Sequence, residues 1–203
     1  MKILKQNHSN VWFVVALEEE FYNDEANILY TGVGKVNAAM ATQYLIDHFP
    51  VDKLINVGTA GGSKKVKTGH IYNCGIFIQR GIWTDNLEKL EVNVVNPTSN
   101  HYQLFTFQEM DKLNIEDYFG TIGTGDTFVT NIDKSGFDLV DMESFAIAYV
   151  CRANNMLDKF YCFKYVSDSG KDSDWFKSLI KSNKAFNKMY KILAKKDKKW
   201  LIK

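Results

Sequence analysis

Arginine and proline are scarce in this chain of 203 residues. Of its 25 Lys and Arg residues only two are arginines, Arg80 and Arg152, and the formal net charge is +1. Bidentate recognition of phosphates and bases depends mainly on arginine, and a nearly neutral chain has no global attraction for nucleic acid. We therefore expect no nucleic-acid partner. The two prolines, Pro50 and Pro97, exclude a proline-rich linker.

The three cysteines, Cys74, Cys151 and Cys162, are odd in number, lie in apolar runs and match no zinc-binding spacing. Buried free thiols in a reducing compartment explain them best, so we expect a cytoplasmic protein. No apolar run approaches the about 20 residues of a membrane span, and the polar start, Met1 to Asn10, is unlike a signal peptide. The four histidines form no ligand cluster. Neither a membrane partner nor a metal or other cofactor is predicted.

The chain does contain enough apolar sequence for a sizeable core, since 45% of its residues are hydrophobic and 24% are charged. Length and composition predict one domain over residues 1–203. Short apolar runs alternate with segments of helical spacing, which predicts an α/β fold with a largely parallel sheet. The predicted strands are Val11–Leu17, Asn27–Thr31, Lys53–Val57, Ile71–Gln79, Phe137–Val140 and Phe160–Val166. The predicted helices are Val36–Phe49, Phe107–Leu113, Ser144–Asn154 and Ser173–Lys196.

The last predicted helix and the residues after it are rich in lysine, with seven between Lys188 and Lys203. A basic amphipathic helix can bind membranes or nucleic acid. We favour the simpler interpretation, in which the lysines form the solvated outer face of a packed helix.

Four polar segments lie where predicted strands end: Glu18–Glu20, Gly58–Gly62, Asp141–Ser144 and Lys164–Ser169. In open α/β sheets ligands bind beyond the carboxyl ends of the strands, so these segments are expected to converge.

Each polar segment also has an ordinary structural explanation. The glutamates can supply charge to a helix N-terminus, the glycines can form a tight turn, and Asp141 or Asp168 can cap a helix. The functional alternatives are a general base, a close backbone approach to a ligand, a ribose-binding carboxylate and a general acid. Gly58–Gly62 lacks the Gly-Lys-Ser/Thr ending of a Walker loop.

Together, in their order along the chain, the segments resemble the methylthioadenosine/S-adenosylhomocysteine nucleosidases of the purine nucleoside phosphorylase superfamily. The motifs that carry the resemblance are Ala16-Leu17-Glu18-Glu19-Glu20, Gly32-Val33-Gly34-Lys35-Val36-Asn37-Ala38-Ala39, Asn56-Val57-Gly58-Thr59-Ala60-Gly61-Gly62, Gly125-Asp126-Thr127-Phe128-Val129, Val140-Asp141-Met142-Glu143-Ser144 and Val166-Ser167-Asp168. The resemblance implies a three-layer α/β/α sandwich around a mixed, mainly parallel sheet, a homodimer, and hydrolysis of the N-glycosidic bond of an adenine nucleoside without a cofactor.

The same resemblance assigns roles to individual residues. Glu20 matches the base that activates water, and Asp168 matches the acid that protonates the leaving purine. The other matched positions are expected to bind substrate: Thr59, Ala60 and Gly61 near the ribose, Phe128 and Val129 at the purine, Met142 and Glu143 at the ribose hydroxyls, and Lys164 and Ser167 beside the acid. Chemistry agrees, because an oxocarbenium-like transition state needs acid/base groups on both sides of the sugar.

The chain departs from the family pattern at three places. Lys164 replaces a common arginine and so loses the planar fork of donors. In the segment Gln79–Asp85 the usual acidic residues are missing or shifted, and the sequence up to about residue 100 looks shortened. After Asp168 the chain reads Ser169-Gly170-Lys171-Asp172, and Trp175 or Phe176 can stand in for the aromatic residue that lines the 5′ end of the substrate.

Two alternatives remain open from the residues. One is a phosphorylase, although three adjacent glutamates at the position of the family's phosphate loop would repel phosphate. The other is a degenerate homologue that binds a nucleoside without turnover, which the altered segment from Gly81 to Asn100 motivates. The joint presence of Glu20, Glu143 and Asp168 favours a hydrolase.

Overall fold

The computed structural model describes residues 1–81, 94–95, 104–117, 121–168 and 172–196. The helices are α1 (Lys35–His48), α2 (Phe107–Leu113), α3 (Ser144–Ala153) and α4 (Asp172–Lys196), with 3₁₀ turns at Ile132–Lys134 and Leu157–Lys159. The strands are β1 (Lys2–Leu4), β2 (Val11–Val15), β3 (Ile28–Tyr30), β4 (Lys53–Gly62), β5 (Ile71–Asn73), β6 (Ile76–Gln79), β7 (Val94–Val95), β8 (Ile115–Asp117), β9 (Thr121–Thr124), β10 (Leu139–Asp141) and β11 (Phe160–Asp168).

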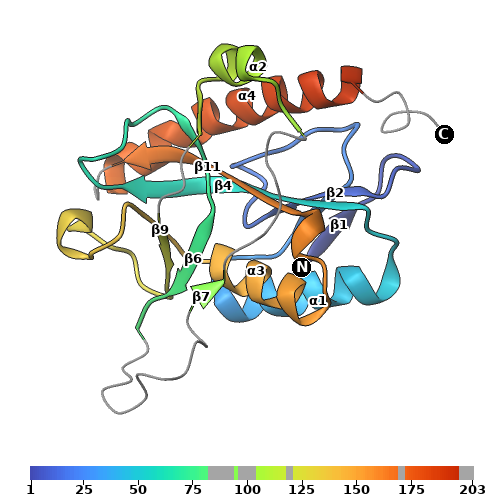
Figure 1. Ribbon diagram of the computed structural model, residues 1–203, viewed down its shortest axis with the longest axis horizontal. Coiled ribbons are helices and arrows are strands. Elements are labelled where there is room, and N and C mark those ends of the chain that lie inside the picture. Colours follow the sequence, from blue (N-terminus) through green and yellow to red (C-terminus); the bar gives the residue numbers. More distant parts are fainter. Residues whose placement is uncertain (82–93, 96–103, 118–120, 169–171, 197–203) are drawn as a thin grey trace.

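The described strands form one sheet with β4 at its centre (Figure 1). Six of the ten strand pairings are parallel, so the sheet is mixed and mainly parallel, as predicted. The first half of β4 pairs with β2, and its last residues, Gly61 and Gly62, pair with β10. Along its other edge β4 pairs with β11 from Leu54 to Gly61. The carboxyl ends of the parallel strands β4 and β11 therefore lie beside one another, and the short antiparallel strand β10 lies next to the last residues of β4.

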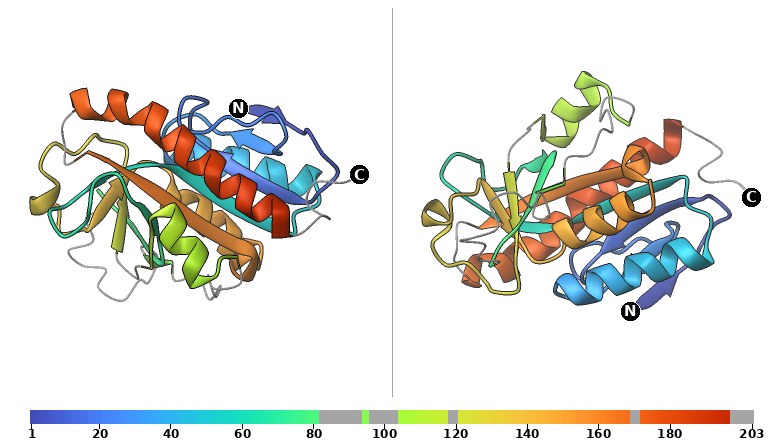
Figure 2. Two further views of the ribbon diagram at one scale, coloured as in Figure 1. Left: turned by 90° about the horizontal axis from the view of Figure 1, so that it is seen from above. Right: turned by 60° about the horizontal axis from the view of Figure 1, so that its bottom comes forward.

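Helices cover both faces of this sheet, which confirms the predicted three-layer arrangement (Figure 2). Side chains alternate between the two faces along a strand. In β2, Phe13 packs in the core cluster that holds α2 and α4, whereas Trp12 and Val14 pack in the cluster that holds α1 and α3. Both clusters are fully apolar layers against the sheet, so each helix is held by burial of its inner face.

Two of the predicted strands differ from the structure by more than a few residues at an end. β4 does not end at Val57 but continues through the glycine-rich segment to Gly62, because β10 and β11 both pair with it there. A Cβ atom on Gly61 would lie 2.6 Å from the side chain of Ile132, and one on Gly62 would lie 2.5 Å from that of Val66, so a larger residue would force these neighbours to move. The predicted strand Ile71–Gln79 is two strands, β5 and β6, that pair with different neighbours.

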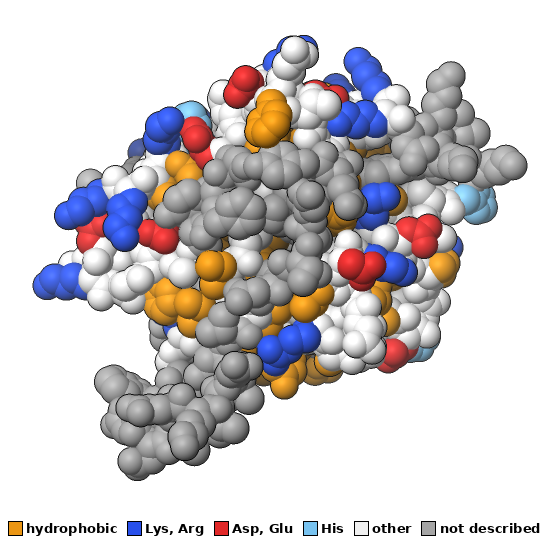
Figure 3. Space-filling model, viewed as in Figure 1, with side chains coloured by type: hydrophobic (Ala, Val, Ile, Leu, Met, Phe, Trp, Pro, Cys, Tyr) orange, Lys and Arg blue, Asp and Glu red, His pale blue; other side chains and the backbone are white. Residues whose placement is uncertain are grey.

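The lysine-rich helix α4 packs as the simpler interpretation predicted. Phe186, Met189 and Leu193 are buried against the sheet, while Lys188 and Lys191 are exposed. On the face in Figure 3 basic and acidic side chains are interspersed, with no continuous basic patch among the coloured residues. No helix of the described segments is long and apolar enough to cross a membrane. The last lysines of the chain, at 198, 199 and 203, lie outside the described residues.

Candidate active site

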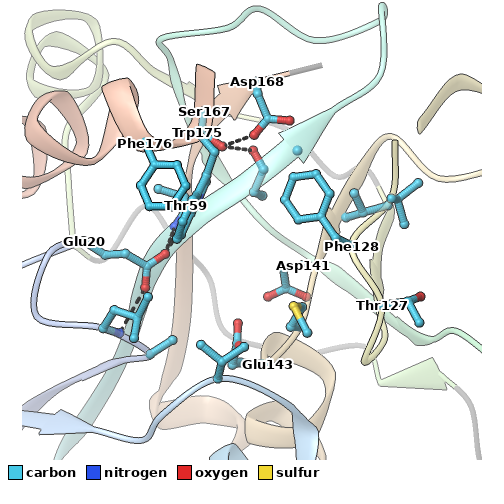
Figure 4. A pocket seen from close by; sticks show the side chains of 18 of the residues that line it. Glu20, Thr59, Thr127, Phe128, Asp141, Glu143, Ser167, Asp168, Trp175 and Phe176 are labelled. Atoms are coloured by element: carbon cyan, nitrogen blue, oxygen red, sulfur yellow. Dashed lines mark hydrogen bonds between the residues drawn. The ribbon is translucent and has the colours of Figure 1, made fainter. Parts of the chain in front are cut away.

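A cavity of about 390 Å³ opens where the strand ends converge (Figure 4). It is built by the segment after β2, the end of β4, the loop after β9, the β10–α3 junction, the end of β11 and the start of α4. The residues that line it are Ala16, Leu17, Glu20, Val33, Thr59, Ala60, Gly61, Arg80, Thr127, Phe128, Val129, Val140, Asp141, Met142, Glu143, Ser167, Asp168, Trp175 and Phe176.

Glu20 lies on one side of the cavity, with 5% of its surface exposed. Its Oε1 accepts hydrogen bonds from the backbone N–H of Thr59 at 2.8 Å and from Thr59 Oγ1 at 2.7 Å. Its Oε2 accepts a longer one, 3.2 Å, from the backbone N–H of Leu17. The carboxylate is thus fixed by β4 and by its own turn, which gives a carboxylate of defined orientation at the cavity wall.

Asp168 and Ser167 end β11 on another side of the cavity. Asp168 is 2% exposed, and Ser167 Oγ donates to its Oδ2 at 2.5 Å. The same hydroxyl lies 3.2 Å from the carbonyl oxygen of Ala60. Figure 4 shows Asp168 and Glu20 on separate walls, each turned towards the cavity.

Glu143 forms the floor, at the first turn of α3. Its Oε1 accepts a 2.9 Å hydrogen bond from the backbone N–H of Gly34, which precedes α1. Gly34 has φ +98°, a conformation that favours glycine, so this donor depends on the glycine. Burial raises the pKa of Glu143 to about 8, and the negative charges of Asp141 and Glu20 add to the rise, against the opposing effect of Lys164.

Lys164 does not line the cavity, although a substrate contact was predicted for it. It lies beneath, 2% exposed, with Nζ 3.1 Å from Asp141 Oδ2. Burial favours the neutral amine, but Asp141 and the other carboxylates raise the pKa of Lys164 above its usual value. Burial opposes the ionisation of Asp141 as well, yet Lys164, Ser144 and Thr124 hold its pKa below the usual value. The pair is therefore charged, and Lys164 offsets negative charge at the site from below.

Gly58 explains how this pair and Glu20 come so close. A Cβ atom there would lie 3.3 Å from both Glu20 Oε1 and Lys164 Nζ. A glycine in β4 thus leaves the gap in which the carboxylate and the ammonium group approach.

The loop after β9 supplies the aromatic wall. Phe128 is 48% exposed and lines the cavity beside Thr127 and Val129. Arg80 braces this loop, because its Nε donates to the carbonyl of Gly123 and its Nη2 to that of Thr127, each at 3.0 Å.

The raised pKa of Glu143 predicts a pH-dependent stability. Between the usual value of 4.5 and about 8 the folded chain holds a proton that the unfolded chain has lost. Stability should therefore fall as pH rises through this window, by up to about 1.4 kcal/mol per pH unit. Glu143→Gln removes the titrating group and should flatten this slope. Urea unfolding of both proteins at pH 5.5, 7.0 and 8.5 measures it, and parallel curves would contradict the assignment.

All the predicted site residues except Lys164 therefore line one cavity. Sequence reasoning missed Asp141 as the partner of Lys164, and it missed Arg80, Val33 and Val140. The scarcity of arginine in the chain could have drawn attention to Arg80, because a planar guanidinium group can donate to several backbone carbonyls at once. Much of the altered segment after Gly81, including Asp85, and Gly170 lie outside the described residues. In the described part of the chain no three His, Cys, Asp or Glu side chains are grouped to hold a metal.

Several known proteins are similar to this chain in sequence. The family model of the phosphorylase superfamily matches residues 20–195. A methylthioadenosine/S-adenosylhomocysteine nucleosidase of Bacillus velezensis is 33% identical over 175 residues, covering 74% of this chain and 71% of the relative. One from Thermotoga maritima is 30% identical over 161 residues, which cover 71% of this chain and 66% of the relative.

Solved structures show the same fold. A Helicobacter pylori methylthioadenosine/S-adenosylhomocysteine nucleosidase bound to butyl-thio-DADMe-Immucillin-A superposes with a TM-score of 0.77, 18% identity, and coverage of 92% of this chain and 98% of that one. A Colwellia psychrerythraea nucleosidase in complex with adenine gives 0.73 and 24%, covering 90% and 95%. The chain belongs to the methylthioadenosine/S-adenosylhomocysteine nucleosidase family of the phosphorylase superfamily, a family of hydrolytic nucleosidases.

Proposed function

We propose that this protein hydrolyses the N-glycosidic bond of an adenine nucleoside of the 5′-methylthioadenosine or S-adenosylhomocysteine type and releases adenine. The observation that carries the proposal is the placement of Glu20, Glu143 and Asp168 on separate walls of one cavity (Figure 4). A base, a ribose-binding carboxylate and an acid are the three groups that this reaction requires.

In the proposed reaction the bond between C1′ and N9 breaks, and its electron pair leaves with the purine. Asp168 donates its proton to N7 of the purine, and water adds to C1′ while Glu20 takes the water proton. Thr59 holds Glu20 through its hydrogen bonds to Oε1, and the carboxyl of Glu143 forms hydrogen bonds with the ribose hydroxyls. Exclusion of water from the cavity would strengthen each of these electrostatic interactions.

The contacts of Ser167 hold the side chain of Asp168 in place. Ser167 Oγ donates to Asp168 Oδ2 at 2.5 Å and lies 3.2 Å from the carbonyl oxygen of Ala60. These contacts fix the carboxyl at the end of β11, where the proposed reaction needs an acid.

The remaining walls suit the parts of the nucleoside. Phe128 offers a face for stacking, and the backbone of Val129 lies beside it for the purine edge. Met142 is placed to pack against the ribose, and the backbone of β4 at Gly61 passes close to Asp168, whose Oδ1 would be in contact with a Cβ there at 3.5 Å. Ala60 and Gly61 let the sugar approach the backbone of β4.

Water is proposed as the nucleophile in place of phosphate. Two cations of the described residues lie at the site, and both are engaged, Lys164 with Asp141 and Arg80 with backbone carbonyls. A phosphate near the ribose would face Glu20 and Asp141 instead, and like charges at short range repel strongly inside a protein.

The test is to incubate the purified protein with 5′-methylthioadenosine in phosphate-free buffer and to identify both products. We expect adenine and free 5-methylthioribose, with no increase in rate and no sugar phosphate after phosphate is added. A sugar 1-phosphate product would establish the phosphorylase alternative, and binding of adenine without any turnover would establish the degenerate one.

A homodimer is the second part of the proposal. Val36, Met40 and Tyr44 follow one another by one turn along α1 and are 70%, 68% and 40% exposed, and Val33 continues this apolar stripe to the cavity. A second copy of the chain is the occupant we propose, because the stripe runs to the rim of the site that the partner would help to cover.

Met40→Lys should convert the dimer into a monomer, because it buries a charge in the apolar contact. Analytical ultracentrifugation measures the change in mass, and Lys188→Glu on the exposed face of α4 is the control. A wild-type chain that sediments as a monomer at tens of micromolar would contradict the dimer.

Two further expectations stay proposals. We propose that residues 1–203 act as one domain, supported by the participation of strands from β1 to β11 in one sheet. We propose a cytoplasmic location, supported by the free, buried state of Cys74, Cys151 and Cys162.

A further inference from the structure

The first turn of α4 contacts the proposed base through one intermediate hydroxyl. Trp175 Nε1 lies 2.9 Å from Thr59 Oγ1, and Thr59 Oγ1 lies 2.7 Å from Glu20 Oε1. In Figure 4 the indole of Trp175 stands directly above Thr59, with Glu20 on the far side of that threonine. Trp175, Thr59 and Glu20, which come from distant parts of the chain, are thus joined in one line of hydrogen bonds.

The direction of each hydrogen bond in this line is fixed by the chemistry of the groups. An indole N–H only donates, so Thr59 Oγ1 must accept from Trp175. The hydroxyl proton of Thr59 is then free to point at Glu20 Oε1, which is an acceptor. A hydroxyl that accepts a hydrogen bond also donates more strongly, since bonds in a chain polarise one another.

This arrangement makes the two oxygens of Glu20 unequal. Oε1 accepts from both the backbone and the hydroxyl of Thr59 at less than 3 Å, whereas Oε2 accepts the 3.2 Å bond from Leu17. Oε2 is therefore the oxygen with more capacity left to receive a proton from water.

From these contacts we infer that Trp175 is a positioning residue for the hydrolytic base: through Thr59 it locks Glu20 so that Oε2 receives the water proton. The inference deepens the proposed function and rests on it. Phe176 packs edge-on against Trp175 with ring centroids 4.7 Å apart, which holds the indole in place. The start of α4 then does more than line the cavity, because it orients the reacting carboxylate.

The test combines kinetics with a direct probe of the indole. Trp175→Phe keeps the aromatic ring and removes the N–H, and should lower kcat about 3- to 10-fold with little change in KM. Thr59→Val breaks the line at its centre and should lower kcat further. If Trp175 acts through Thr59, the double variant Trp175→Phe/Thr59→Val has the same kcat as Thr59→Val alone. In Thr59→Ser, which keeps a hydroxyl, Trp175→Phe still lowers kcat by its full factor.

The direct probe is the indole ¹H–¹⁵N resonance of Trp175, assigned by its disappearance in Trp175→Phe. We expect it to shift upfield in Thr59→Val, where the acceptor is lost, and to remain in place in Ile180→Ala, a control on the exposed side of α4. An unmoved resonance, or losses in kcat that multiply in the double variant, would overturn the inference even in an active enzyme. A shifted resonance in a protein that hydrolyses no nucleoside would instead overturn the proposed function and leave the hydrogen-bonded line in place.

Discussion

Asp168→Asn should lower kcat for 5′-methylthioadenosine by about 10³-fold, within the range of general acid catalysis. The substitution keeps the shape of the side chain and its hydrogen bond with Ser167, but an amide cannot protonate a leaving purine. Since Asp168 is almost fully buried at the end of β11, no other described acid is placed to replace it at that wall of the cavity. Steady-state kinetics with a matched measurement of substrate binding gives the result.

A substrate with a better leaving group separates acid catalysis from a general loss of structure. A nitrophenyl riboside leaves as a stable anion and needs no protonation, so Asp168→Asn should hydrolyse it nearly as fast as the unmodified protein. Ser167→Ala is the matched control for the neighbouring position and should cost about tenfold, since it loses one hydrogen bond. Equal loss with both kinds of leaving group would argue against Asp168 as the acid.

Lys164→Met should destabilise the fold by about 3–5 kcal/mol, because it leaves Asp141 charged and unpaired by a cation in the interior. The pair lies 3.1 Å apart with both side chains at most 2% exposed. Urea unfolding at pH 7 measures the loss. The double variant with Asp141→Asn should recover most of it, since no uncompensated charge remains.

Lys164→Arg tests the departure of this chain from the arginine common in its family. Arginine keeps the charge but is larger, and the space around position 164 is bounded by the backbone of Gly58 and the carboxylate of Glu20. We therefore expect a loss of stability between that of Lys164→Met and none. A Lys164→Met protein as stable as the original would show that the pair does not offset the buried charge.

The alternating pattern predicted the layers and most strands, because apolar runs in this chain mark buried β-strands and their lengths fit the sheet. It failed at Gly58–Gly62, where propensity indicates a turn and the pairing of β4 with β10 and β11 overrides it. No local pattern shows which strands will flank a glycine-rich segment. Tertiary hydrogen bonds decide that.

The same limit explains why the position of Lys164 beneath the cavity was not predicted. The family resemblance predicted Glu20, Glu143 and Asp168 as site residues, and the structure brings their segments together around one cavity, as expected for strand ends. Lys164 was grouped with them because it stands where many members of the family have an arginine just before the Ser-Asp pair. Asp141 reaches Lys164 from β10 across β4, a contact between residues 23 positions apart that spacing alone does not reveal.

The measurement that tests the account most directly is the rate of adenine release from 5′-methylthioadenosine by Glu20→Gln beside the unmodified protein, in phosphate-free buffer. The glutamine keeps the hydrogen bonds that its oxygen accepts from Thr59 but cannot take a proton from water. We predict steady adenine release by the unmodified protein, and a loss of at least about 100-fold in the variant with nucleoside binding retained. Release at the same rate by both proteins, or by neither until phosphate is added, would contradict a hydrolase that uses Glu20 as its base.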